Sequence, residues 1–207
     1  AAQQSYNFIE DYEISFMIVF IVLVTLLILY IVYENHTRNK ELLKYAQTDA
    51  LTGLYNKETT EQLTDELLSE DENKYHAFLI LDVDCFKQIN DIYGHAVGDI
   101  VLQKFGKLLK GTFREGDILG RIGGDEFGVI MKNIQTKDIA MKKAEELLAK
   151  TQAYKIDELK GNNISISIGI STAPQDGDCY MDLYKRADQA LYQAKRSGKA
   201  RVCNYFS

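Results

Sequence analysis

Residues 118–131 read ILGRIGGDEFGVIM. Two short apolar runs flank Gly123 and Gly124, which is the pattern of a β-hairpin. Glycine tolerates positive φ and lets a backbone approach a ligand closely, and two carboxylates, Asp125 and Glu126, directly follow the glycines. A Gly-Gly-Asp sequence by itself is most often only a turn. The stretch therefore predicts a hairpin with an acidic tip, whose significance depends on the rest of the chain.

A second acidic pair ends the run AFLILDVD, residues 77–84. A short, nearly continuous apolar run is expected for a strand buried on both faces. Carboxylates are costly at the end of such a strand unless they are paired. If this strand lies beside the hairpin, Asp82, Asp125 and Glu126 converge, and Mg²⁺ is the cation that prefers such oxygen ligands. The two stretches together predict a magnesium site that also brings substrate phosphates.

Helices and strands alternate through the rest of the polar part. In residues 163–172, NISISIGIST, isoleucines alternate with small residues, which indicates a strand with one buried face. Apolar residues at helical spacing predict several amphipathic helices. The expected helices are 57–69, 98–112, 136–151 and 181–196, and the expected further strands are 163–172 and 201–206. The fold class is therefore mixed α and β.

Residues 14–33, ISFMIVFIVLVTLLILYIVY, contain no charged side chain. Twenty helical residues span about 30 Å, the hydrocarbon thickness of a bilayer. A buried core helix is the alternative, but it would be shorter and would show a polar face. Lys and Arg are absent before this stretch and present just after it, at Arg38, Lys40 and Lys44. The positive-inside rule then places the C-terminal part in the cytoplasm.

This pattern predicts a single-pass protein of the inner cell membrane, with the lipid bilayer as a partner. The residues before the span are too few for a sensor domain, and the residues after it read as a helix that continues out of the membrane. The expected parts are an extracytoplasmic stub (1–13), a transmembrane helix (14–33), a helical connector (34–48) and one folded domain (49–207).

Composition excludes several classes of protein. The chain has 207 residues, of which 46% are hydrophobic, and a net charge of −6, so it is no disordered tail, collagen-like repeat or small disulfide scaffold. Binding to DNA or RNA wants a basic stripe, and none is present, so no nucleic-acid partner is expected. The three cysteines have no zinc spacing and are expected as free thiols.

Four motifs lie in order along the polar part of the chain. They are TDALTGLYNK (48–57), LDVDCFKQIND with the following Gly94-His95 and Gly98-Asp99 (81–99), RIGGDEF (121–127) and AKRSGK (194–199). Together and in register, they resemble the GGDEF domain of diguanylate cyclases, over nearly all of residues 48–206. Lys57 and Lys199 stand where the family usually has Arg, and Cys85 stands where it often has an aromatic residue.

The resemblance implies an α+β, ferredoxin-like palm similar to that of adenylyl cyclases, with a central antiparallel sheet flanked by helices. It also implies condensation of two GTP into cyclic di-GMP by a homodimer that holds one GTP per subunit. In the family roles, Asp82, Asp125 and the carbonyl of Val83 bind Mg²⁺ or Mn²⁺, and Glu126 lies near a second ion. Asp125 is also a candidate proton acceptor, a role that bulk water can fill. Lys87 stabilises charge on the reacting phosphates.

The same resemblance assigns the substrate contacts. Lys195 and Lys199 hold the terminal phosphates; Lys199 keeps the charge of the usual Arg but loses its bidentate fork. Asn90 and Asp99 read the base, because a carboxylate accepts from both donors on the Watson–Crick edge of guanine. Asp99 also suits the N-terminal part of a helix without any ligand. Phe86 and His95 complete the substrate-binding set, although His95 serves equally well as a packing residue.

A further motif is Arg114-Glu115-Gly116-Asp117, an R-x-x-D shortly before Gly123. Family members carry a product-inhibition site at this offset, so Arg114 and Asp117 are expected to bind cyclic di-GMP. Two other functions stay open. One is a catalytically silent domain that acts as a receptor for GTP or cyclic di-GMP, and the other is an enzyme that makes a mixed guanine–adenine dinucleotide.

Overall fold

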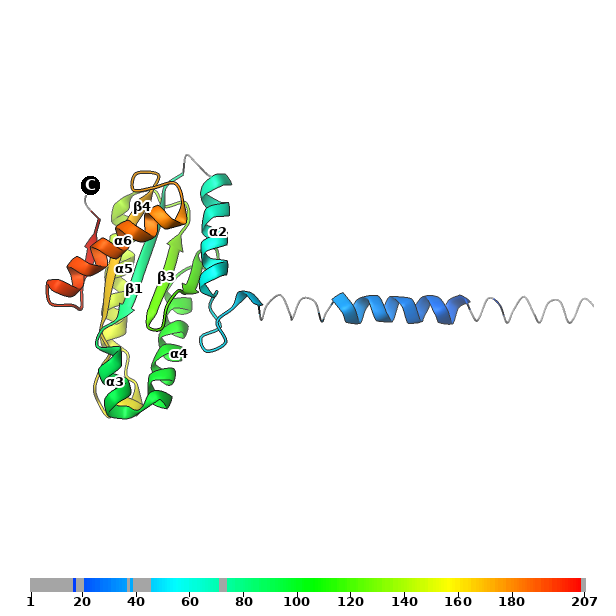
Figure 1. The fold of residues 1–207 in the computed structure, drawn as a ribbon, viewed down its shortest axis with the longest axis horizontal. Coiled ribbons are helices and arrows are strands. Elements are labelled where there is room, and N and C mark those ends of the chain that lie inside the picture. The colour runs from blue at the N-terminus through cyan, green and yellow to red at the C-terminus, as the bar shows by residue number, and fades with distance from the viewer. Residues whose placement is uncertain (1–16, 18–20, 37, 39–45, 71–73, 206–207) are drawn as a thin grey trace, which may run out of the picture. The chain divides into compact units, whose positions relative to one another are not determined.

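The computed structural model describes residues 17, 21–36, 38, 46–70 and 74–205, in two units, Ala1–Ala46 and Gln47–Ser207 (Figure 1). In the first unit, residues 21–36 are helical and their apolar side chains are exposed. Among the described residues, no helix combines the length and the apolar character that a membrane crossing requires. The predicted span 14–33 and connector 34–48 lie partly outside the described residues.

The second unit is built on one five-stranded sheet. Its order is β2 (Ile118–Arg121), β3 (Glu126–Met131), β1 (His76–Val83), β4 (Ile166–Ala173) and β5 (Val202–Asn204). The first four strands pair antiparallel, whereas β5 pairs parallel to β4. The expectation of a central antiparallel sheet is therefore correct for four strands and wrong at the β5 edge. A helix lies between β4 and β5 in the chain, and such a crossover returns the next strand in the same direction.

Helices cover both faces of this sheet (Figure 1). One core joins alternate residues of β1, β3 and β4 to α4 (His95–Thr112) and α5 (Lys137–Ala153). The other core joins the opposite residues of the sheet to α2 (Lys57–Glu70) and α6 (Tyr180–Arg196). All eight residues of β1 are buried, as its continuous apolar run predicts. Charged side chains that bind a ligand are therefore expected at the ends of such buried strands.

β4 differs from its expectation, because all eight of its residues are buried rather than one face. The small residues of its second face let α6 approach closely. A Cβ on Gly169 would lie 2.1 Å from the carbonyl oxygen of Ala187, and the hydroxyl of Ser171 donates a 2.8 Å hydrogen bond to the carbonyl of Leu183. The polar alternation therefore marks a close helix contact, not a solvent-exposed face.

The predicted helices and the hairpin around Gly123 and Gly124 are confirmed, with ends shifted by a few residues. The sequence analysis missed two elements, α3 (Phe86–Tyr93) and the short 3-10 helix η1 (Asp157–Leu159). No side chain of α3 is fully buried, so the helix lacks the long apolar stripe by which α4 was found. This short helix carries several of the predicted substrate residues.

Candidate active site

The two acidic stretches meet at one edge of the sheet. Asp82, at the end of β1, lies opposite Glu126, at the start of β3, in the antiparallel register. Beyond this pair, the backbone N–H of Val83 donates to the carbonyl of Asp125 across 3.2 Å. Asp82 is buried, and Asp125 and Glu126 are half-buried. The expectation that the two stretches are neighbours is thus confirmed.

This cluster is electrostatically strained. Burial raises the pKa of Asp82, as do the nearby Asp125 and Asp84 carboxylates, and an ion pair with Lys195 opposes the rise. The Nζ of Lys195 lies 2.7 Å from Oδ2 of Asp82. Burial also raises the pKa of Glu126, followed by repulsion from Asp82. Both carboxylates would be more readily ionised with additional positive charge beside them.

The donor set suits a hard divalent cation, since Asp82, Asp125, Glu126 and the carbonyl of Val83 all offer oxygen. These carboxylates do not all converge within 4.8 Å. In the part of the chain that the structure describes, the only group of His, Cys, Asp or Glu that does so is Asp178, Cys179 and Asp182, at the start of α6. Exposed acidic groups of that kind are common without an ion. The metal roles of the predicted residues therefore stay a prediction that the chemistry of the donors supports.

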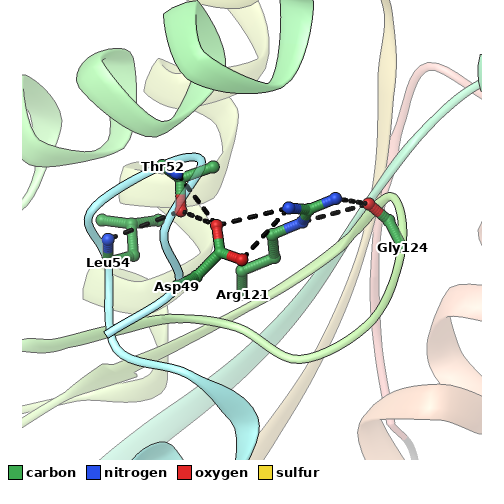
Figure 2. Close-up of polar contacts among 5 residues, drawn as sticks. All are labelled: Asp49, Thr52, Leu54, Arg121 and Gly124. Carbon is green, nitrogen blue, oxygen red and sulfur yellow. Dashed lines mark hydrogen bonds and ion pairs between the residues drawn. The ribbon is translucent and has the colours of Figure 1, made fainter. Parts of the chain in front are cut away.

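A network of polar contacts holds the Gly123–Gly124 turn (Figure 2). Arg121 donates from Nε and Nη2 to the carbonyl of Gly124, at 3.1 and 2.6 Å, and from Nη1 to the carboxylate of Asp49, at 3.3 and 3.2 Å. Asp49 also accepts from the backbone and hydroxyl of Thr52, at 2.9 and 2.7 Å. Burial alone would raise the pKa of Asp49, but these contacts hold it below its usual value.

Arg121 and Asp49 are positioning residues to which the sequence analysis gave no role. They tie the turn before β3 to the segment before α2, and neither is predicted to touch substrate. The signal was present, since both lie within the quoted motifs TDALTGLYNK and RIGGDEF. Their contact joins residues 72 positions apart, which no local pattern reveals.

The corner between α3 and α4 brings together part of the predicted base-reading set. Oδ1 of Asn90 is buried and has no hydrogen-bond partner among the described residues. A Cβ on Gly98 would lie 2.0 Å from that oxygen and 3.2 Å from the ring of Phe86, so any other residue at this position would clash with Asn90. A buried acceptor without a partner is unfavourable unless a donor arrives. The base edge of guanine offers such donors.

The remaining substrate residues lie around this corner and along α6. Lys87 is exposed in the first turn of α3, and His95 and Asp99 are exposed at the start of α4. The ammonium of Lys195 contacts the carboxylate of Asp82, as described above. The Nζ of Lys199 donates to the Sγ of Cys85 at 3.1 Å, and this contact raises the pKa of the ammonium.

Asp84, two residues after Asp82, has a different role from its neighbour. Its Oδ1 accepts from the hydroxyl of Ser167 at 2.7 Å, and its Oδ2 accepts from the hydroxyl of Ser165 at 2.8 Å and the N–H of Ala200 at 3.1 Å. The last contact holds a turn in which Gly198, Lys199 and Ala200 all have positive φ. Asp84 therefore fixes the backbone that carries Lys199.

The predicted inhibitory residues lie close together before β2. Arg114 Nε lies 3.0 Å from Asp117 Oδ1, the guanidinium also donates to the carbonyl of Lys132, and Asp117 accepts from the N–H of Lys132 at 3.1 Å. Arg114 is exposed and Asp117 is buried. Both border a cavity of about 570 Å³ that is also lined by Asn133, Gln135 and Lys143.

The structure combines a mixed sheet that has helices on both faces with carboxylates at the ends of two adjacent strands and a Gly-Gly turn between β2 and β3. A known protein family has this combination. The profile of the family described as "Diguanylate cyclase, GGDEF domain" matches residues 46–201, and the chain belongs to this family. The resemblance drawn from the four sequence motifs is thereby confirmed.

Individual relatives agree. The chain is 37% identical over 170 residues to "Diguanylate cyclase A" of Treponema denticola, covering 79% of this chain and 46% of the relative. It is 37% identical over 177 residues to "Response regulator PleD" of Caulobacter vibrioides, covering 82% and 39%. The chain spans about half the length of the curated relatives that it matches.

Solved structures show the same fold. The coiled coil and GGDEF domain of DgcB from Caulobacter crescentus, in complex with cyclic di-GMP, matches with a TM-score of 0.77 and 25% identity, covering 84% of this chain and 93% of that one. The active GGEEF domain of a diguanylate cyclase from Vibrio cholerae matches with a TM-score of 0.69 and 29% identity, covering 73% and 97%.

Proposed function

We propose that this chain is the catalytic part of a diguanylate cyclase, which condenses two GTP into cyclic di-GMP and two pyrophosphates as a homodimer. The observation that carries the proposal is the pairing of Asp82 with Glu126 at one sheet edge, with Lys195 in contact with Asp82. Relatives named diguanylate cyclase support it, as does the family that the chain belongs to. Cyclases of this family generally depend on a metal, and we infer Mg²⁺ or Mn²⁺ from the oxygen donors.

In each half-reaction the 3′-hydroxyl of one GTP attacks the α-phosphorus of the other. A new O–P bond forms, the bond to the bridging α–β oxygen breaks, and pyrophosphate leaves; a second such step closes the ring. When bound, the divalent cation polarises phosphoryl oxygens and promotes ionisation of the hydroxyl. Asp125 or water takes the hydroxyl proton, Lys87 stabilises charge on the reacting phosphates, and Lys195 and Lys199 bind the terminal phosphates.

Base choice rests on the α3–α4 corner. The buried, unpartnered Oδ1 of Asn90 accepts from a donor on guanine, and Asp99 accepts from the N1–H and the exocyclic amine. Adenine offers no matching pair of donors, so it would leave these acceptors unpaired. A buried acceptor that the wrong base leaves unpaired, here Oδ1 of Asn90, discriminates strongly between ligands. The corner therefore favours GTP over ATP and argues against the mixed dinucleotide.

The test is to incubate the full chain with Mg²⁺ and labelled GTP, with and without ATP, and to resolve the products. Cyclic di-GMP alone supports the proposal, and a mixed dinucleotide with ATP present contradicts the proposed base choice. A sample that is dimeric and binds GTP but forms no cyclic di-GMP supports the alternative function, a silent receptor for GTP or cyclic di-GMP.

We further propose product inhibition at Arg114 and Asp117. The cavity beside them supports this site, and solved GGDEF domains in complex with cyclic di-GMP support binding of the product by a domain of this family. The exposed guanidinium of Arg114 binds a phosphate or a guanine edge of the product, and Asp117, which is in contact with Arg114, accepts from guanine. Added cyclic di-GMP should lower the turnover of the wild type, and Arg114→Ala should relieve that inhibition. Equal inhibition of both proteins would contradict the site.

For residues 14–33 we propose a membrane span, with the catalytic domain in the cytoplasm. The support is the run of residues without a charge and the Lys and Arg residues that follow it. Flotation of the full chain with lipid vesicles, beside a chain that begins at residue 34, tests the anchor. Equal flotation of both chains would contradict it.

A further inference from the structure

Lys195 is in contact with a residue that is also a predicted metal ligand. It lies in the last turn of α6, and its Nζ is 2.7 Å from Oδ2 of Asp82. The side chain of Asp82 is 9% exposed and that of Lys195 is 35% exposed. About a third of the Lys195 side chain is exposed, so it can move off the buried carboxylate without disrupting the core. The contact is therefore both strong and reversible.

The charges around Asp82 explain the contact. Asp125 and Asp84 act on the charge of Asp82, and Asp82, Asp125 and Asp188 act on that of Glu126. Among the described residues, Lys195 is the one cation recorded within ion-pair distance of Asp82. Removing it would leave buried carboxylates without compensation, which is costly in a partly desolvated site. Lys195 thus supplies the positive charge that this cluster needs.

A divalent cation on Oδ2 of Asp82 would compete with the ammonium. Mg²⁺ binds carboxylate oxygens at about 2.1 Å, so an ammonium on that oxygen would lie only a few ångströms from the ion. Like charges at such a distance repel. Metal binding at Asp82 therefore favours release of Lys195.

We propose that Lys195 is the internal counter-ion of the metal site: it holds Asp82 until a divalent cation arrives with nucleotide, and is then released to bind the phosphates. The inference rests on the proposed function only in placing the metal at Asp82. It adds that Lys195 competes with metal when nucleotide is absent and assists binding when nucleotide is present. The same residue therefore couples the two binding events, because each favours its transfer from carboxylate to phosphate.

Lys199 provides a matched control. It is predicted to contact the same phosphates and lies four residues further along, but its Nζ contacts the thiol of Cys85, and its charge acts on Asp84 and Asp82 only from beyond ion-pair distance. Its removal should weaken nucleotide binding and improve metal binding much less than the removal of Lys195. A general effect of removing one positive charge from the active site would instead appear in both variants.

The experiment titrates Mn²⁺ into the full chain in detergent, without nucleotide, and follows the electron paramagnetic resonance signal of free Mn²⁺. Binding that is lost in Asp82→Asn is assigned to this site, which separates it from the acidic group at Asp178 and Asp182. We expect Lys195→Met to bind Mn²⁺ about fivefold more tightly than wild type. Lys199→Met and the charge-preserving Lys195→Arg should stay within about twofold of wild type, a smaller change than the one expected for Lys195→Met.

A second arm adds a non-hydrolysable GTP analogue at saturating Mn²⁺, where both lysine-to-methionine variants should bind the analogue more weakly than wild type. The counter-ion role is supported if Lys195→Met alone binds Mn²⁺ more tightly in the first arm and binds the GTP analogue more weakly in the second. Unchanged or weaker Mn²⁺ binding by folded Lys195→Met overturns it, and thermal unfolding establishes that the variant is folded. If wild type and all variants bind no Mn²⁺ that depends on Asp82, the proposed metal site fails as well.

Discussion

The two sides of the end of β1 use the same residue type in opposite ways. On the hairpin side, Asp82 faces Glu126 and has Lys195 as its counter-ion. On the side of β4 and β5, Asp84 accepts from two serine hydroxyls and one backbone N–H. The first side concentrates charge that a ligand can compensate, whereas the second has its hydrogen bonds complete.

This difference separates binding from support. A carboxylate whose partners are all within the fold gains nothing from a ligand, so Asp84 stabilises the positive-φ turn at Gly198–Ala200. A crowded carboxylate gains when a cation arrives, so Asp82 and Glu126 are suited to hold one. Substitutions on the hairpin side should therefore impair activity more than stability, and substitutions on the other side should impair stability first.

The largest expected effect is on the hairpin side. Glu126→Gln keeps the size of the side chain and removes a carboxyl group whose pKa is raised by burial and by Asp82. Cyclase activity should fall about 100-fold or more, because a preorganised charge at the reacting centre is lost. The unfolding temperature should stay unchanged or rise, since repulsion with Asp82 is relieved. Activity assays and thermal unfolding measure the two quantities; a large loss of stability would contradict the comparison.

On the side of β4 and β5, Asp84→Asn should impair stability more than activity. The amide can present only one carbonyl oxygen, so its NH₂ would face donors that now bind the carboxylate. Stability should fall by about 2 kcal/mol, with a several-fold rise in KM for GTP as the turn that carries Lys199 loosens. Denaturant unfolding and steady-state kinetics check this.

Ser165→Ala is the matched control for Asp84→Asn, because it removes one of the hydrogen bonds to Asp84 and leaves the carboxylate intact. Its effects should have the same direction and be smaller. If Asp84→Asn instead lowers kcat at unchanged stability and KM, Asp84 belongs to the chemistry and the two sides are not distinct.

Sequence reasoning succeeded where local pattern and residue type suffice. The continuous apolar run predicts buried β1, and the glycines predict the hairpin, so the meeting of Asp82 with Glu126 follows from two short stretches. It was wrong about β4, because small polar residues such as Ser171 can face a helix backbone as well as water. It missed the parallel pairing of β5, which depends on the α6 crossover.

Sequence reasoning also could not predict contacts between residues far apart in the chain, because these contacts depend on the tertiary arrangement. The pairing of Lys195 with Asp82 depends on where α6 ends relative to β1, and no periodicity encodes that distance. The pairing of Asp49 with Arg121 is similar, although both residues lie within motifs that the sequence analysis quoted. A motif can thus identify which residues matter before the structure shows what they do.

The smallest expected effect concerns this supporting contact beneath the Gly123–Gly124 turn. Thr52 and Arg121 lower the pKa of Asp49 from 3.8, so its contribution to stability is present above pH 3.8 and is lost as the pH falls through the lowered value. Asp49→Asn should therefore cost about 1 kcal/mol at pH 7, and the difference from wild type should shrink toward zero at a pH well below 3.8. Denaturant unfolding at both pH values measures it. Since Arg121 keeps its two contacts to the carbonyl of Gly124, activity should change much less than in Glu126→Gln. A pH-independent difference would contradict the assignment of this contribution to the ionised carboxylate of Asp49.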